Sequence, residues 1–303
     1  MPAAPAVRPQ YFLLPLGSVL MWSGNMVVTK MSASVISPVT IGFYRWLIAG
    51  LALTPFLAYG VWRERHRIRP HLGKLAVLGA LGMAVYQGLM YFAAAHTSAT
   101  NMAFITSLVP LLTIAVSAAL MQESPPRLAV LGGLLSLAGI SVLVSHGRPA
   151  MLLEAGVNRG DVLIFLAALG YAVYGVLVRK WAIPLSAWHS LYVQIGFGLL
   201  VQLPAFLYLP ATPLDAANLP LVLYAALLPS IFAPYLWLRA IDVLGASRAS
   251  IFVNLTPVFT IVIAALLLAE PVESYHLAGG AIVLTGVMLA QWRPGARRPA
   301  RGA

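Results

Sequence analysis

The side chains in this sequence with the clearest capacity for chemistry are aromatic and amide residues set within long apolar runs. Trp22 and Asn25 are three residues apart, as are Tyr171 and Tyr174, so each pair shares one face of a helix. Such faces suit a cavity in which rings stack on a ligand and amides bond its polar ends. We therefore expect a substrate-binding site there, with the further candidates Tyr44, Tyr86, Tyr91, Asn101, Gln194, Tyr235, Trp237 and Asn254.

Two basic residues and two prolines also lie within apolar runs. A mid-membrane Arg such as Arg45 costs about 2.5–3.5 kcal/mol, so it must face protein or water. It would contact an anionic group of a ligand or bond the carbonyls of a helix end. Lys30, near the end of its run, would extend its amine to the membrane surface. Pro110 and Pro257 are expected in mid-helix, where they would bend the helix, either for gating or to shape the bundle.

Catalytic and metal-binding patterns are absent from the sequence. It has no glycine-rich loop for ATP phosphates, and none of its six histidines has metal-ligand spacing with another. It has no cysteine, and no Asp or Glu within the apolar runs to relay protons. We therefore expect no enzyme, no metal and no cofactor. A membrane-embedded lipid-modifying enzyme, the alternative from another class, would need acidic or histidine clusters at one membrane face.

The elements that must position these residues are membrane-spanning helices. Hydrophobic residues make up 60% of the 303 residues and charged residues only 9%, against roughly 25% in soluble domains. A helix needs about 20 apolar residues to cross the hydrocarbon core. Aromatic residues also gather in belts at membrane interfaces, which is the competing explanation for the candidates above. The predicted spans are 11–29, 39–62, 75–94, 100–121, 127–145, 162–179, 187–209, 219–238, 248–269 and 275–292.

The placement of positive charge predicts the orientation. If both termini are cytoplasmic, 15 of the 19 Lys and Arg residues lie on the cytoplasmic side, including those of the tails 1–10 and 293–303. Three lie on the other side, and Arg45 is within a span. This bias is typical of an even number of spans with both termini in the cytoplasm. The net charge of +11 then reflects orientation and contact with the lipid bilayer, and we expect no nucleic-acid partner.

An internal repeat divides the chain into 11–146 and 161–292. Shifting the sequence by 147 residues places Pro110 on Pro257, Glu123 on Glu270 and Gly139 on Gly286, and a shift of 149 places Arg45 on Gln194. Each unit has five spans, so the second must enter the membrane from the opposite face. The fold class predicted is all-α integral membrane, with ten helices as two inverted five-helix repeats around a central cavity.

Small residues form one face of the fifth and the tenth span. Gly132, Gly133 and Gly139 lie on 127–145, and Gly279, Gly280 and Gly286 lie on 275–292. Such faces allow helices to approach closely. They would pack within the bundle or, alternatively, join two protomers as a homodimer.

With these landmarks the chain resembles the drug/metabolite transporter superfamily in its ten-helix form of two EamA-type repeats. The resemblance covers residues 10–292 and rests on Trp22 to Asn25, Lys30, Arg45, Pro110, Glu123 and the paired glycines. Within the superfamily it is most similar to the bacterial aromatic amino acid exporters of the YddG type. That resemblance implies the fifth and tenth helices set apart from the cavity.

The resemblance implies export of amino acids, aromatic ones and others, and of metabolites across the bacterial inner (plasma) membrane by alternating access. Within transport, the alternative is a sugar-phosphate or nucleotide-sugar exchanger, which would need several basic residues in the cavity where Lys30 and Arg45 are the only candidates. A passive channel is a third alternative. The direction of transport comes from the resemblance alone, and the spacing of the residues does not fix it.

Overall fold

The computed structural model describes residues 9–32, 35–94, 96–97, 105–122, 124, 126–148, 150, 158–268 and 272–291. Every regular element within these ranges is a helix. Seven of the helices there are long and apolar enough to cross a membrane, and the shorter apolar helix α7 (Val109–Met121) accompanies them. The expectation of an all-α, multi-pass membrane protein is therefore confirmed.

The helices of the first half follow the chain in a simple order. A 3-10 turn, η1 (Pro9–Phe12), precedes α1 (Leu13–Ser32). The elements that follow are α2 (Pro38–Arg63), the short α3 (Arg65–Ile68) and η2 (Arg69–His71), then α4 (Leu72–Gly79), η3 (Ala80–Val85), α5 (Tyr86–Ala94), α7 and α8 (Arg127–Val144).

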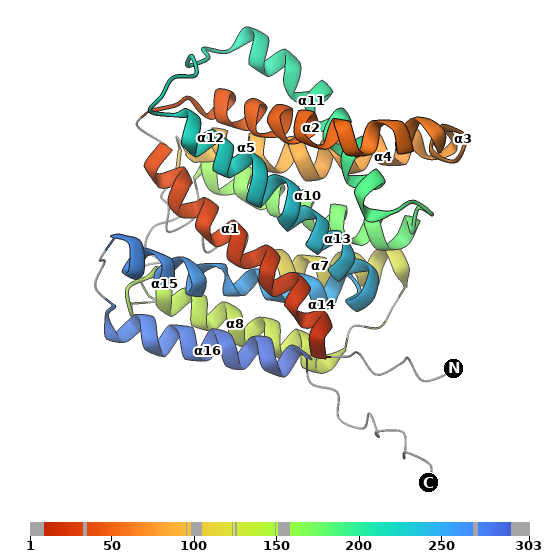
Figure 1. Ribbon diagram of the computed structural model, residues 1–303. Helices are drawn as coiled ribbons and strands as arrows, with labels where there is room; N and C mark the ends of the chain where they lie inside the picture. The colour runs from red at the N-terminus through yellow and green to blue at the C-terminus, as the bar shows by residue number, and fades with distance from the viewer. Residues whose placement is uncertain are drawn as a thin grey trace.

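The second half begins with α10 (Arg159–Trp181) and α11 (Ala187–Tyr208). It continues with α12 (Leu219–Leu227), η4 (Leu228–Phe232), α13 (Ala233–Leu244), α14 (Ala246–Ser250), η5 (Ile251–Leu255), α15 (Thr256–Leu268) and α16 (Ser274–Gln291). The start of α1 and the end of α16 lie at the same end of the bundle (Figure 1).

Two helices each contain one π-helical segment, and the two segments occupy matching positions. η3 joins α4 to α5, and η4 joins α12 to α13, with a separation close to the 147-residue shift of the repeat. In η4 the cause is local. Pro229 has no N–H to donate to Ala225 O, and the Ser230 hydroxyl donates to that carbonyl instead, over 2.7 Å. Segments of this kind are frequent at functional sites.

Each of the two matched prolines lies at the start of an α-helical segment. Pro110 is the second residue of α7, and Pro257 is the second residue of α15, which directly follows the 3-10 segment η5. At the first turn of an α-helix the missing N–H has no intrahelical acceptor to lose. The prolines therefore begin α-helical segments. Because Pro257 also lies within the continuous helical stretch Ala246–Ile263, a bend of the spanning helix at these positions stays a prediction.

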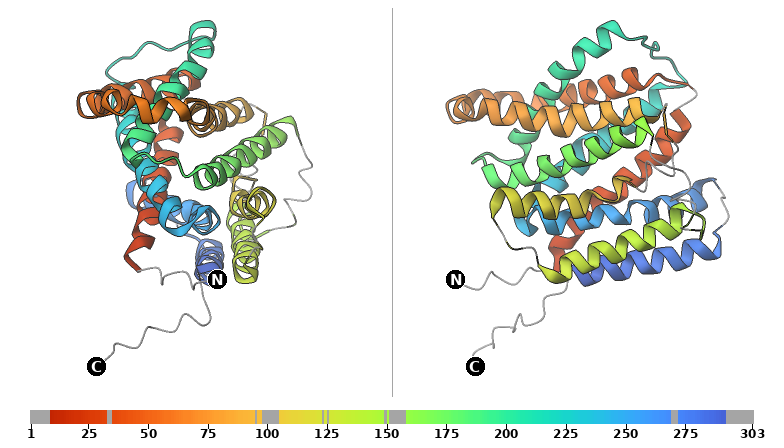
Figure 2. Two further views of the ribbon diagram at one scale, coloured as in Figure 1. Left: turned by 90° about the vertical axis from the view of Figure 1, so that its right-hand side faces the viewer. Right: turned by 180° about the vertical axis from the view of Figure 1, so that it is seen from behind.

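The glycine faces of α8 and α16 pack against each other within one chain. A Cβ atom added to Gly286 would lie 2.6 Å from Gly132 O, and one added to Gly139 would lie 2.8 Å from Gly279 O, so the helices run antiparallel. Between these contacts the Ser136 hydroxyl donates to Val283 O over 3.3 Å. The pair lies at one edge of the bundle in every view (Figures 1 and 2). A homodimer through these helices stays a prediction, and it would have to use their outer faces.

One carboxylate is buried, which the sequence did not lead us to expect. Asp161, in the first turn of α10, is 5% exposed and forms a capping box with Asn158. Its carboxylate also accepts from the Thr97 hydroxyl, and the Asn158 amide donates to Thr97 Oγ1 over 3.2 Å. These bonds fasten the turn after α5 to the start of α10, and thereby one half of the chain to the other.

Candidate functional site

Five predicted site residues meet in the middle of the bundle, and we call them the aromatic cluster. They come from both halves of the chain and from four helices, of which α5 packs against α10, α10 against α13 and α13 against α1. The members are Trp22, Tyr86, Tyr171, Tyr174 and Trp237.

Tyr171 is the centre of the aromatic cluster. Its ring centroid lies 4.9 Å from that of Tyr86, 5.8 Å from that of Tyr174 and 6.3 Å from those of Trp22 and Trp237. The Trp22 and Trp237 rings are 5.2 Å apart. These spacings are those of tilted, stacked and edge-to-face aromatic pairs. The two helix faces that the sequence singled out, on α1 and α10, therefore do contact each other.

The polar ends of two cluster residues are fixed by hydrogen bonds. The Trp22 indole N–H donates to Pro229 O in η4 over 3.2 Å. The Tyr174 hydroxyl donates to Gln194 Oε1 over 3.2 Å, and the Gln194 amide donates to Ser190 Oγ over 2.8 Å. A Cβ at Gly82 in η3 would lie 2.7 Å from the Tyr174 ring, so a glycine is needed there. Each π-helical segment thus contacts an aromatic residue of the other half.

Among the buried polar groups that have no hydrogen-bond partner in the described part of the chain, two belong to predicted site residues. The Trp237 indole N–H is one, and its side chain is 3% exposed. The other is the whole amide of Asn254 on η5, which is 1% exposed. A buried polar group without a partner costs about 1–3 kcal/mol, so it usually meets a ligand or ordered water. Both groups therefore fit a binding role.

Arg45 lies deep in the bundle, as expected from its place in the sequence. Its side chain is 3% exposed, and Nε donates to Ser230 Oγ over 2.7 Å. Its guanidinium carbon lies 5.3 Å from the centroid of the adjacent Trp46 ring. Arg45 thus links α2 of the first half to η4 of the second, which favours the structural alternative of its two predicted roles.

The remaining candidates lie elsewhere or outside the described residues. Tyr44 packs edge-to-face on Phe206, and Tyr235 stacks on Trp188 with centroids 3.9 Å apart. Asn25 is half-buried on α1, one turn beyond Trp22. The side chains of Lys30 and Tyr91, and the whole of Asn101, fall outside the described residues.

Sequence reasoning missed Ser230, which bonds both Arg45 and a backbone carbonyl. The available signal was the Pro229-Ser230 pair within an apolar run, since a proline there frees a carbonyl that a serine hydroxyl can bond. The aromatic cluster contains no ionisable group other than tyrosine hydroxyls. In the described ranges no three His, Asp or Glu side chains are placed to hold a metal ion. The arrangement is suited to binding a ligand by stacking and hydrogen bonding.

Comparison with known proteins identifies the class. The EamA-like transporter family model matches residues 10–145 and again 158–292, so the chain belongs to the EamA-like transporter family. It is a multi-pass membrane protein of a family of transporters, and its environment is the lipid bilayer.

Individual relatives are distant but cover most of the chain. An uncharacterized transporter, YyaM, from Bacillus subtilis (strain 168) is 25% identical over 92% of each chain. A probable terminal-alkyne amino-acid exporter from Streptantibioticus cattleyicolor is 26% identical over 88% of this chain and 91% of its own. A solved crystal structure has a TM-score of 0.71 at 22% identity, covering 94% of this chain and 97% of its own. That last likeness concerns the fold alone.

Proposed function

We propose that this protein is a secondary transporter that exports amino acids, aromatic ones among them, across the bacterial inner membrane. The observation that carries the proposal is the aromatic cluster, to which both halves of the chain contribute. A site shared by two halves is reshaped when the halves move relative to each other, which is what alternating access requires. The amino-acid exporter among the relatives supports the same substrate class.

The chemistry of the cluster suits an amino acid. The rings of Trp22 and Tyr171 offer faces to an aromatic or aliphatic side chain. The Trp237 N–H offers a donor for the carboxylate. The Asn254 amide on η5, which is not a member of the aromatic cluster, offers a further donor and an acceptor for the ammonium group. Because the described residues of the cluster carry no fixed charge, the site favours a substrate whose net charge is near zero. This argues against a sugar-phosphate, which would need several cations.

The proposed mechanism needs two inverted five-helix repeats, and three observations support them. The π-helical segments η3 and η4 occupy matching positions in the two halves. The α8–α16 contacts are unchanged when the halves are exchanged, because Gly132 and Gly139 correspond to Gly279 and Gly286. The start of α1 and the end of α16 lie on the same side of the bundle, as expected for ten spans with both termini in the cytoplasm (Figure 1).

The test is transport by the purified protein in liposomes. A panel of radiolabelled amino acids is loaded, and efflux is followed with and without a pH gradient. We expect saturable efflux of aromatic amino acids. If no amino acid leaves faster than from empty vesicles, the substrate assignment fails. A rate that rises without saturating would indicate a channel.

Variants connect the transport to the site. Trp22→Ala and Tyr174→Ala should abolish saturable efflux. Each removes an aromatic ring that contacts Tyr171 and that would contact the substrate. Phe206→Ala is the control, since it truncates an aromatic ring that stacks on Phe43 away from the cluster. Unchanged transport in Trp22→Ala and Tyr174→Ala, with the proteins folded, would show that this face does not contact the substrate.

A further inference from the structure

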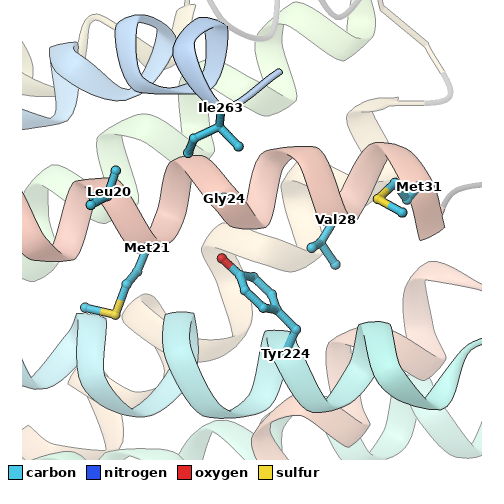
Figure 3. A pocket seen from close by; sticks show the side chains of 7 residues that line it. All are labelled: Leu20, Met21, Gly24, Val28, Met31, Tyr224 and Ile263. Atoms are coloured by element: carbon cyan, nitrogen blue, oxygen red, sulfur yellow. The ribbon is translucent and has the colours of Figure 1, made fainter. Parts of the chain in front are cut away.

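A groove runs along the side of α1 that faces away from the aromatic cluster. Its floor is a stripe on α1 at helical spacing, Leu20, Gly24, Val28 and Met31, with Met21 beside it (Figure 3). Tyr224 of α12 forms one wall and Ile263 of α15 the other. The groove therefore lies between the first half of the chain, which supplies α1, and the second half, which supplies α12 and α15.

The dimensions of the groove match half of a bilayer. Leu20 and Met31 are eleven residues apart, which at 1.5 Å per residue is about 16 Å along the helix axis. The hydrocarbon core is about 30 Å thick, so the groove spans roughly one leaflet. Its volume of about 270 Å³ is roughly nine times the ~30 Å³ that one water occupies in the liquid. That is enough for a segment of hydrocarbon chain.

The chemistry of the groove and its surroundings is apolar. None of the seven lining residues is charged, and the one polar side-chain group is the Tyr224 hydroxyl. The rim residues Leu20 and Met31 are 49% and 53% exposed. Beyond the rim, the exposed side chains on α12 and α15 are also apolar: Leu223, Leu227, Val262 and Leu266. The groove is thus continuous with the surface that contacts the bilayer.

Gly24 determines how deep the groove is. The Tyr224 hydroxyl lies against the α1 backbone at this position, where any side chain would meet it, and the ring reaches α1 between Met21 and Val28 (Figure 3). A flexible chain that enters from the rim therefore contacts the Tyr224 ring beside Gly24 and the side chains of Val28 and Met21. Burying apolar surface in this way gains about 0.8 kcal/mol per methylene when the alternative is water, but within a bilayer the gain comes from packing alone.

We propose that this groove binds one phospholipid acyl chain, from the leaflet nearer the Ser32 end of α1. The chain lies lengthwise along α1, with its outer part between Met31 and the start of α12, and its end near Leu20. The match of length to one leaflet, the absence of charge and the continuity with the lipid-facing surface together select a hydrocarbon chain as occupant. The proposal does not depend on the transported substrate.

The test uses a phospholipid with a photoreactive diazirine in its acyl chain, mixed into liposomes that hold the intact protein. After illumination, mass spectrometry measures lipid attached to α1 and α12, and, for comparison, to the outer face of α16. We expect labelling of the groove to saturate as the mole fraction of the probe lipid rises, while labelling of α16 rises in proportion.

Val28→Trp fills the groove and should abolish the saturable part of its labelling, because the indole occupies the space of the acyl chain. Leu284→Trp on α16, where Leu284 is 45% exposed, is the control for adding an indole to the lipid-facing surface. Met31→Trp at the exposed rim is a second filling variant, in case Val28→Trp does not fold.

Two results would overturn the proposal. One is labelling of the groove that rises in proportion to the probe and is unchanged in both filling variants. The other is a dimer in the same vesicles that Met31→Trp abolishes, with no lipid attached to the groove, since a second copy of the chain would then occupy it.

Discussion

Adding one methyl group at Gly286 tests how closely α8 and α16 approach. A Cβ there would lie 2.5 Å from Ser136 N and 2.6 Å from Gly132 O, both backbone atoms that no side-chain rotation can move. The two helices must separate by about 0.5–1 Å to admit it, and a gap of that size forfeits a quarter to a half of each lost dispersion contact. We therefore expect Gly286→Ala to destabilise the pair.

The magnitude follows from a matched control on the same helix. Gly280 is also buried on α16, but a Cβ added there meets no atom within 4 Å. Gly280→Ala should gain about 0.5–1 kcal/mol, because alanine favours the helix. Gly286→Ala has the same gain and an additional overpacking cost of about 1–3 kcal/mol. The difference between the two variants isolates the overpacking cost.

The assay is thermal unfolding of the purified proteins in one detergent. A cost of 1–3 kcal/mol corresponds to a Tm lower by roughly 2–10 °C in Gly286→Ala than in Gly280→Ala. Gly139→Ala should behave like Gly286→Ala, since its Cβ would lie 2.7 Å from Val283 N. Equal melting of Gly286→Ala and Gly280→Ala would refute the close approach. If only one of Gly286→Ala and Gly139→Ala lowers the Tm, the contacts between α8 and α16 are not equivalent in the two halves of the chain.

Three further substitutions test single contacts. Gly24→Ala should destabilise the protein, because the added Cβ meets the Tyr224 hydroxyl. Tyr224→Phe in the same chain should restore stability, because the nearest ring atom then lies 3.5 Å from the added Cβ. If the effects of the two substitutions on Tm are additive, this contact is contradicted. Ser230→Ala should lower the free energy of unfolding by about 2–4 kcal/mol, because it removes a hydrogen bond to the charged Arg45 and one to a carbonyl. The Tm is compared with that of Ser141→Ala, which loses only an exposed hydroxyl bond. Asp161→Asn should speed hydrogen exchange of the Asn158 N–H, because the carboxylate oxygen that accepts from it is replaced by an amide with one acceptor fewer. Unchanged exchange at Asn158 would show that the capping box is dispensable.

Hydropathy and charge were sufficient to predict an all-helical membrane protein and to place most helices. The thickness of the bilayer fixes the number of apolar residues that a spanning helix needs, so such helices are easy to recognise. The interior of the helices was less predictable. The sequence shows Pro110 within an apolar run, but not that the α-helix begins there, because the choice between 3-10 and α-helical backbone depends on the packing around it. Asp161 looked like a loop residue because its burial comes from Thr97, which is distant in the sequence.

The candidate site could be predicted in part, for a geometric reason. Three-residue spacing puts Trp22 and Asn25 on one face, but it does not say which helix that face meets. The cluster formed because α13 packs against both α1 and α10. Tyr44, also an aromatic residue within a span, instead faces Phe206. Which residues of distant helices contact each other depends on how the two halves pack, and this packing cannot be predicted from the spacing of residues in one sequence.

The α8–α16 pair has a consequence for how such a chain arises. Ser136 bonds Val283, the residue that corresponds to it in the other half, so a pseudo-two-fold axis passes through this contact. A surface that is complementary to itself about such an axis is the kind that joins identical subunits in a symmetric dimer. The contact that holds α8 to α16 within one chain therefore has the geometry by which two copies of one helix would pair in opposite directions.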